Sequence, residues 1–161
     1  MKDDKMAAPP TAGEQPKEES ICIRYAETTD YPWLKEHDQH LTAEILRGKI
    51  KNKEIYLVQK VNFSVTNQQT LGYLRYNLFW DEIPFMNKIY LLEAYRNRGI
   101  GQRLIDYWEN SMKLKGHKTV LTSTLSNEGA QHFYRKMGYT EIGGFKYLDE
   151  AFEIIFFKAI D

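Results

Sequence analysis

The sequence has little cysteine, no surplus of charge of either sign and no long apolar run. Cys22 is the one cysteine among 161 residues, which excludes an internal disulfide, and no Cys and His residues have zinc-finger spacing. The 22 basic residues balance 22 acidic ones, whereas a protein that coats nucleic acid or an anionic membrane needs a basic surplus. The N-terminus lacks the apolar core of a signal peptide, and no stretch approaches about 18 uncharged apolar residues. We therefore expect a soluble, cytoplasmic protein that binds no metal, nucleic acid or membrane.

The composition changes at Ser20. Residues 1–19 hold three of the five prolines and no aromatic residue, so they cannot bury enough surface to offset the entropy of ordering them. We predict a flexible tail over 1–19. Residues 20–161 have a length that suits a single domain.

Hydrophobic periodicity from residue 21 predicts elements in the order β-α-α-β-β-β-α-β-α-β-β. Strands are expected over 21–25, 54–58, 71–76, 86–92, 118–125, 140–145 and 152–158. Helices are expected over 33–37, 42–51, 100–114 and 127–136. Thr29-Asp30 would cap the first helix, 67–69 would form a hairpin turn, and a loop with Pro84 would precede the fourth strand.

The order of these elements indicates a mixed sheet. The middle strands can pair as an antiparallel meander, whereas the strand-helix-strand step across 86–125 implies right-handed parallel pairing. We therefore predict an α/β fold in which helices flank a mixed central sheet.

The segment between the predicted strand 86–92 and the predicted helix 100–114 carries the most information about function. Gly99 and Gly101 lack Cβ atoms, so the backbone can turn tightly and approach a ligand. The first N–H groups of the helix would then point at that ligand, and the helix dipole favours an anion. Arg96, Arg98 and Arg103 add guanidinium groups, which suit phosphate oxygens. The segment predicts a pyrophosphate site; the plainer alternative is a strand-to-helix turn with solvated arginines.

Two common nucleotide motifs are excluded. A dinucleotide fingerprint needs a third glycine, and Leu104 stands in its place. A P-loop needs Gly-Lys-Ser/Thr, and Gly101 is followed by Gln102. Phosphates would have to bind in another way.

The same segment resembles the GNAT superfamily of N-acetyltransferases. Arg96-x-x-Gly99-x-Gly101 is similar to the acetyl-CoA signature Arg/Gln-x-x-Gly-x-Gly/Ala of that family. Asn127-x-x-Ala130-x-x-Phe133-Tyr134-x-x-x-Gly138-Tyr139 is similar to its second conserved block, one helix and one strand further on. The order of elements from 21 to 158 also fits. The resemblance implies acetyl-CoA as cofactor and a sheet whose parallel strands splay apart at the cofactor site.

The resemblance assigns cofactor-binding roles by position. Backbone groups of Leu91 and Leu92 would pair with the pantetheine arm, and an N–H there would polarise the thioester carbonyl. Asn127 would contact the cofactor beside the second helix. The residues that would hold the pyrophosphate through their backbone are Arg96, Asn97, Arg98, Gly99, Ile100, Gly101, Gln102 and Arg103.

Tyr134 matches the tyrosine that serves this family as general acid near the cofactor sulfur. A departing thiolate must be neutralised, and because tyrosine ionises near pH 10, Tyr134 would hold a proton to donate at neutral pH. The alternative is a packing residue beside Phe133.

The general base is not identified by the resemblance. Asn87 stands where many members have a glutamate, and an amide cannot act as a base at neutral pH. Asp81, Glu82 or Glu93 are alternatives, and each is also explained as a plain surface carboxylate. Aromatic and acidic groups suit a cationic amine. The candidate acceptor residues are Trp33, Tyr76, Trp80, Asp81, Glu82 and Asn87.

Three hypotheses follow from these residues. The first is an N-acetyltransferase that uses acetyl-CoA and a primary amine of a small molecule or peptide, by direct attack in a ternary complex. The second is an acetyl-CoA-binding sensor or scaffold without turnover, and the third is a structural domain without cofactor. The apolar run 154–157 would lie within the sheet or at a homodimer interface.

Overall fold

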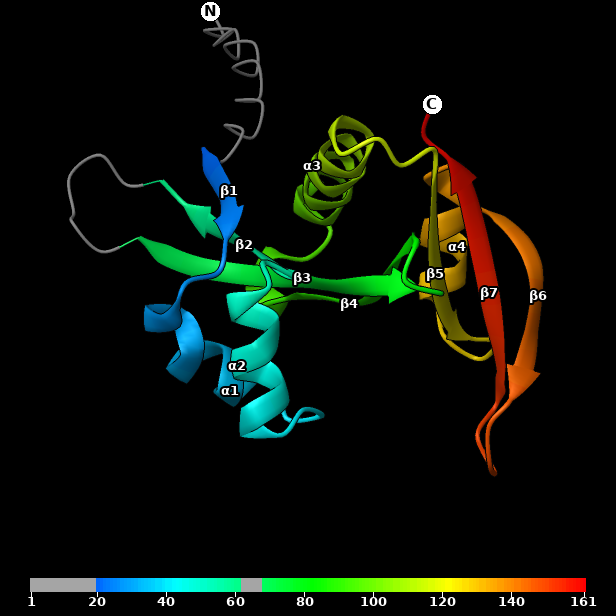
Figure 1. Ribbon diagram of the computed structural model, residues 1–161, viewed down its shortest axis with the longest axis horizontal. Coiled ribbons are helices and arrows are strands. Elements are labelled where there is room, and N and C mark those ends of the chain that lie inside the picture. The colour runs from blue at the N-terminus through cyan, green and yellow to red at the C-terminus, as the bar shows by residue number, and fades with distance from the viewer. Residues whose placement is uncertain (1–19, 62–67) are drawn as a thin grey trace, which may run out of the picture.

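The computed structural model describes residues 20–61 and 68–161. The predicted tail, 1–19, and Asn67 of the predicted turn lie outside these ranges. In the described chain, seven strands form one sheet in the order β1-β2-β3-β4-β5-β7-β6 (Figure 1). The strands are β1 (Ile21–Tyr25), β2 (Ile55–Lys60), β3 (Gln69–Phe79), β4 (Ile83–Leu91), β5 (Thr119–Leu125), β6 (Thr140–Lys146) and β7 (Phe152–Ala159). The helices are α1 (Tyr31–His37), α2 (Ala43–Lys51), α3 (Ile100–Leu114) and α4 (Ala130–Lys136), with short 3-10 turns η1 (Thr28–Asp30) and η2 (Glu93–Tyr95).

The predicted order of elements and the mixed sheet are confirmed, and α3 has the predicted bounds. Two local predictions were wrong. The loop prediction for Pro84 fails because this residue lies near the start of β4, before β5 joins at Phe85, where a strand tolerates proline. The capping prediction is wrong for the side chain: Asp30 stands at the N-cap of α1, but its carboxylate makes no cap bond and accepts hydrogen bonds from the Arg24 guanidinium (2.7 and 2.9 Å) and the Glu27 N–H (2.7 Å) instead.

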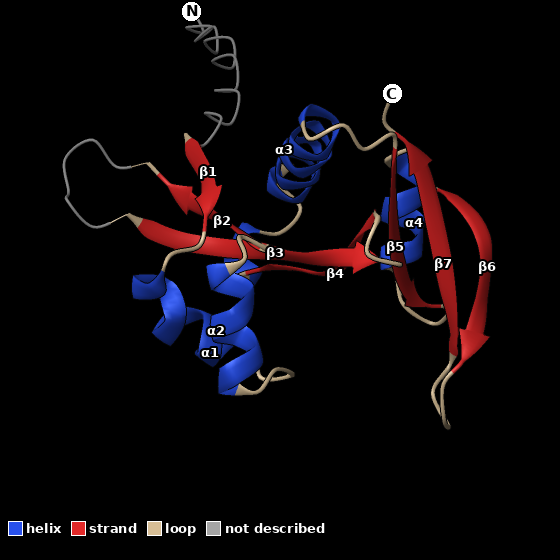
Figure 2. Cartoon of the chain, viewed as in Figure 1, coloured by secondary structure: helices blue, strands red, loops and turns tan. Residues whose placement is uncertain are grey.

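The helices cover both faces of the sheet (Figure 2). One buried cluster joins α1 and α2 to one face, with Leu34 and Leu46 packed against Tyr73. The larger cluster joins α3 and α4 to the other face, with Trp108 and Tyr134 among its members. Side chains alternate between the faces along each strand, so neighbouring residues of β3 and β4 belong to different clusters.

The parallel pairing of β4 with β5 is short. The register covers Phe85↔Leu121 and Met86↔Thr122, although β4 runs on to Leu91 and β5 to Leu125. Within the described residues the two strands therefore part after Met86 and Thr122. This is the splay implied by the family resemblance, and it begins earlier than the Leu91–Leu92 position expected from the sequence.

A β-bulge stands where the gap begins. Arg75 lies opposite Lys88 and Tyr76 lies opposite Met86, so Asn87 is the extra residue of β4. A bulge bends its strand and increases the local twist. The bulge at Asn87 thus turns the second half of β4 away from β5.

Candidate functional site

Two cavities meet at the gap between β4 and β5. The first, of about 740 Å³, is called here the α3 cavity. The second, of about 670 Å³, is called the polar cavity. Ile89 and Ala130 line both, so the two cavities adjoin at these side chains.

The start of α3 forms one end of the α3 cavity. Gly99 stands at the N-cap with φ +77°, a left-handed conformation that glycine adopts without strain. The first intrahelical bond runs from the Arg103 N–H to the Gly99 carbonyl (3.1 Å), so the N–H groups of residues 100–102 precede it. Gly99, Gly101 and Gln102 line the cavity, which places these donors and the positive end of the α3 dipole beside it.

The edge of β4 forms the second wall of the α3 cavity. The Leu92 N–H donates to the Leu71 carbonyl on β3 (2.8 Å), and a trans peptide points its C=O opposite to its N–H. The Leu91 carbonyl therefore faces away from β3, where it accepts a bond from Arg96 Nε (2.9 Å). Backbone groups alternate sides along a strand, so Ile89 also presents its N–H and C=O to the gap.

The remaining walls of the α3 cavity are apolar. A Cβ at Gly101 would lie 3.6 Å from Leu91 Cδ1 and 3.8 Å from Phe133 Cζ. Glycine at this position therefore keeps the passage between β4, α3 and α4 wide. The cavity combines an apolar passage, a strand edge whose polar groups face away from β3, and a helix N-terminus.

Tyr134 lines the polar cavity from α4 and is only 5% exposed. Its ring packs between those of Tyr139 and Phe156, each at 5.8 Å between centroids. Burial raises the pKa of Tyr134, a contact with the Thr122 hydroxyl lowers it, and the charges of Glu128 and Glu153 raise it further. Tyr134 is therefore a neutral phenol at neutral pH.

Two carboxylates stand on the same side of the polar cavity as β5. Glu128 lies in the turn between β5 and α4, and its Oε2 accepts a bond from Thr124 Oγ1 (2.7 Å). Glu153 lies on β7 opposite Leu125, the last residue of β5. Sequence reasoning missed both residues. Glu128 stands inside the second motif block and could have been considered, whereas only the pairing of β5 with β7 brings Glu153 to the site.

Cations occupy the opposite wall of the polar cavity, on β3 and β4. Arg75 and Lys88 lie opposite each other in the sheet register and line the cavity. The Arg75 Nε donates to Oδ2 of the fully buried Asp38 (2.8 Å), and Lys88 Nζ lies 4.0 Å from Asp38 Oδ1. Asp38 Oδ1 has no hydrogen-bond partner among the residues that the structure describes. His40, from the connection between α1 and α2, also lines this cavity.

The structure brings half of the cofactor residues expected from the sequence to the α3 cavity, and it brings the general-acid candidate and one expected acceptor residue to the polar cavity. Tyr134 and Asn87 line the polar cavity. Those that line the α3 cavity are Leu91, Arg96, Asn97, Gly99, Gly101 and Gln102.

The other expected cofactor residues lie outside the α3 cavity. Leu92 bonds to β3, and the Ile100 side chain belongs to the core. The Arg98 guanidinium lies 5.4 Å from the centre of the Tyr95 ring, and Asn127 is exposed beside the cavity-lining Glu128 and Gly129.

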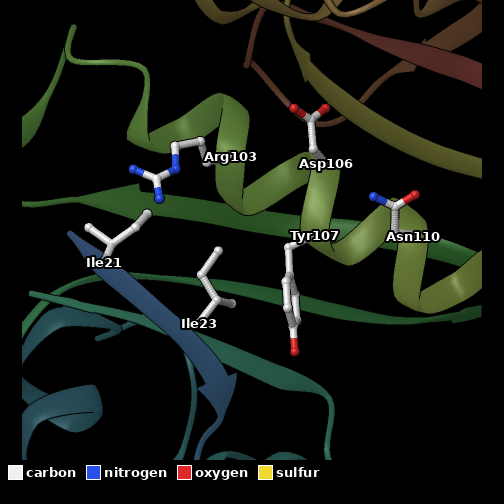
Figure 3. A pocket seen from close by; sticks show the side chains of 6 residues that line it. All are labelled: Ile21, Ile23, Arg103, Asp106, Tyr107 and Asn110. Atoms are coloured by element: carbon white, nitrogen blue, oxygen red, sulfur yellow. The ribbon is translucent and has the colours of Figure 1, made fainter. Parts of the chain in front are cut away.

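Arg103 projects from the other side of α3. Its backbone N–H is used within the helix, and its side chain points toward Ile21 of β1 (Figure 3). There it lines a separate cavity of about 420 Å³ between β1 and α3. Arg96, Arg98 and Arg103 are close in sequence. The turn of α3 nevertheless places the Arg103 side chain beside β1, whereas Arg96 lines the α3 cavity.

Most of the expected acceptor residues also lie elsewhere. Trp33 stacks on His37 (4.1 Å between ring centroids), and the buried Tyr76 hydroxyl accepts a bond from Lys115 Nζ (3.1 Å). Trp80 and Asp81 form the tip of the β3–β4 hairpin, both with positive φ.

The carboxylates considered as bases are also separated from the site. Glu82 lines a small cavity with His117 at the start of β4, and Glu93 is exposed in η2. The hairpin lies at the start of β4, whereas the gap lies along the second half of β4. These carboxylates are therefore close to β4 in sequence but line neither cavity at the gap.

Among the described residues no group of three or more His, Cys, Asp or Glu side chains could hold a metal ion. No helix in the described part of the chain is long and apolar enough to cross a membrane.

Comparison with known proteins agrees with this geometry. Residues 52–141, more than half of the chain, match the family described as an acetyltransferase (GNAT) domain. The fold is similar to that of Ard1 from Thermoplasma volcanium, with a TM-score of 0.72 and 13% identity over 86% of this chain and 97% of that one. It is also similar to the ribosomal-protein-S18-alanine N-acetyltransferase from Escherichia coli (TM-score 0.68, 17% identity, 88% and 95% covered). A GNAT-family acetyltransferase from Bacillus cereus gives a TM-score of 0.67 and 21% identity, with 87% and 97% covered. Comparison with curated proteins gives no match.

Proposed function

Since the chain belongs to the GNAT family of acetyltransferases, we propose that it transfers an acetyl group to a primary amine of a small molecule or peptide. Both reactants would be held together, and the amine would attack directly. The observation that carries this proposal is the meeting of two chemically different cavities at the gap between β4 and β5. One suits a phosphorylated cofactor, and the other presents ionisable groups.

The residues of the α3 cavity fit acetyl-CoA. Acetyl-CoA is the cofactor, and when bound it supplies an acetyl group activated as a thioester. The N–H groups at the start of α3 can hold its pyrophosphate, and Arg96 adds positive charge. The N–H groups of Ile89 and Leu91 and the Ile89 carbonyl can pair with the amides of its pantetheine arm, whereas the Leu91 carbonyl already accepts a bond from Arg96 Nε. Ala130, Phe133 and the Cβ-free Gly101 leave an apolar passage from the helix terminus to the gap.

Tyr134 would act as the general acid. It holds a proton on Oη at neutral pH because its surroundings disfavour the phenolate. It lines the polar cavity beside Ala130, which is shared by both cavities. A positioned proton donor contributes roughly 10²–10⁴-fold to a rate.

Glu128 and Glu153 are placed to accept protons from the amine. An acceptor amine arrives as an ammonium ion and loses one proton before it attacks. The nitrogen would then bond to the acetyl carbon as the carbon–sulfur bond breaks, and it would lose a second proton. Tyr134 would donate its Oη proton to the departing thiolate and regain one of the two protons lost by the amine, so that one proton is released to solvent. Both carboxylates line the polar cavity, unlike Asp81 and Glu93.

Thiol release from acetyl-CoA, measured with a panel of amines and peptide N-termini, tests this proposal. Cofactor binding is measured separately by thermal unfolding, since ligand at about 100 times its Kd adds roughly 2.7 kcal/mol of stability. Stabilisation together with acceptor-dependent thiol release supports the proposal. Stabilisation without release for any amine would favour an acetyl-CoA sensor, and no stabilisation would favour a structural domain.

A further inference from the structure

We propose that the acceptor is a small amino acid, with a free carboxylate near the primary amine that is acetylated. This inference rests on the proposed acetyl transfer and adds the substrate class. It comes from the separation of charge across the polar cavity, where Arg75 and Lys88 face the carboxylates Glu128 and Glu153. The cationic wall binds the carboxylate, and the acidic wall binds the amine.

The separation of charge follows from the strand order. Arg75 and Lys88 lie opposite each other on β3 and β4, on the near side of the gap. Glu128 and Glu153 belong to the β5–α4 turn and to β7, beyond the gap. A molecule seated in the cavity therefore meets cations from one sheet half and carboxylates from the other.

The cationic wall keeps a surplus of positive charge. Asp38 supplies one negative charge to the two cations, and it engages Arg75 at 2.8 Å but Lys88 only at 4.0 Å. The Arg75 side chain is 9% exposed and is fixed by this pair, so it is held ready for an anion and loses little freedom when one binds. The carboxylate of the acceptor would neutralise the positive charge that Asp38 leaves unbalanced.

The acidic wall stands beside Tyr134. Glu128, Glu153 and Tyr134 line the same cavity, and the charges of the two carboxylates raise the pKa of Tyr134. An ammonium group bound between them lies beside Tyr134, the proposed donor of a proton to the leaving sulfur. The orientation with the carboxylate on Arg75 and Lys88 thus brings the amine, rather than the acid, to the acetyl donor.

The same charges act against other amines. A polyamine would bring a second ammonium group to Arg75 and Lys88, and like charges placed together disfavour binding. A neutral amide at that position leaves the positive charge that Asp38 does not neutralise without a counter-charge. The site is therefore selective for an acceptor with charges of both signs.

The test compares amino acids, their carboxamides, the matching amines without carboxylate, and aminoalkyl phosphates. Acceptor binding is measured by calorimetry with CoA present, and turnover is measured by thiol release. We expect amino acids to bind about tenfold or more tightly than their carboxamides, the loss expected when a charge-assisted bond is removed. Equal or tighter binding of the carboxamides overturns the proposal, and a preference for the phosphates overturns the assignment of a carboxylate.

A variant tests whether the cationic wall causes the preference for amino acids over carboxamides. Lys88→Gln should raise the KM for amino acids about tenfold more than the KM for carboxamides, while Lys113→Gln, an exposed change on α3, should alter neither. An equal effect of Lys88→Gln on both acceptors contradicts the proposal. Because binding is measured independently of turnover, selective binding without thiol release would contradict the proposed transfer reaction and leave the assigned binding site intact.

Discussion

Thr122 is the last residue of β5 that pairs with β4, and its buried hydroxyl donates to the Met86 carbonyl at 3.0 Å. This hydrogen bond joins β4 to β5 at the last paired residues before the gap. Thr122 also contacts Tyr134, whose pKa it lowers against the effect of burial. One side chain therefore joins the end of the strand pairing to the residue proposed as general acid.

Thr122→Val tests the importance of this bond for stability. Valine keeps the shape but leaves the buried Met86 carbonyl without the donor, which should lower the free energy of unfolding by about 1–3 kcal/mol. Urea unfolding followed by circular dichroism measures the change. Thr140→Val is the matched control, because Thr140 is exposed and its hydroxyl lies 3.4 Å from the Phe157 carbonyl. Equal stability of Thr122→Val and the unmodified protein would contradict this role.

Gly99→Ala tests the backbone conformation at the start of α3. An alanine at φ +77° costs about 1–2 kcal/mol, although its Cβ would have open space around it. Gly48→Ala in α2 is the control, because its Cβ also has open space and alanine favours a helix interior by about 0.5–1 kcal/mol. We expect opposite signs in thermal unfolding, destabilising at Gly99 and stabilising at Gly48. Two changes of the same sign would contradict the conformational argument.

The buried pair of Asp38 and Arg75 should be far more sensitive than a pair on the surface. Arg75→Gln leaves a carboxylate buried without its cation, which costs about 3–5 kcal/mol. The double variant Arg75→Gln/Asp38→Asn should recover most of the loss. Arg135→Gln removes the partly exposed pair with Glu141 and should cost about 1 kcal/mol or less. Chemical unfolding distinguishes these values, and similar losses for Arg75→Gln and Arg135→Gln would contradict the prediction.

Much of the fold was predictable because helices and strands are dictated by local periodicity. α3 shows this well: Leu104, Trp108 and Met112 recur at helical spacing, and all three are buried. The geometry of the α3 cavity was also predictable, since a strand, two glycines and a helix N-terminus are consecutive in the chain. The consecutive residues around Gly99 are therefore sufficient to predict the local backbone geometry.

The polar cavity was not predictable in the same way, because its residues come from separate elements. Arg75 and Lys88 meet through the β3–β4 register, and Glu153 reaches the cavity through the pairing of β7 with β5. Trp80 and Asp81 were predicted instead because they are close to β4 in the chain, but they lie in the hairpin before the start of β4. The residues of such a site are brought together by pairing between strands that are distant in sequence. Local sequence patterns do not predict that pairing.

The stability of the protein should fall at alkaline pH because several buried tyrosines must ionise on unfolding. Burial raises the pKa of Tyr73, Tyr134 and Tyr139, and for Tyr139 the nearby Glu109 raises it further. The unfolded chain loses these protons near pH 10, whereas the folded chain retains them. Their contribution is therefore fully present below about pH 10 and is lost as the pH rises toward the folded pKa values. Unfolding free energies that stay constant from pH 9 to 11 would contradict this expectation.

Tyr134→Phe separates catalysis from folding and binding. Phenylalanine keeps the ring contacts with Tyr139 and Phe156 but removes the proton on Oη, so kcat should fall by roughly 10²–10⁴-fold. Stabilisation by acetyl-CoA should persist, because the α3 cavity does not include this hydroxyl. Tyr107→Phe is the control, since Tyr107 is 43% exposed on α3 and lines the cavity beside β1. Unchanged kcat in Tyr134→Phe with an accepted amine would exclude Tyr134 as the general acid, and a parallel loss of acetyl-CoA binding would indicate a structural role instead.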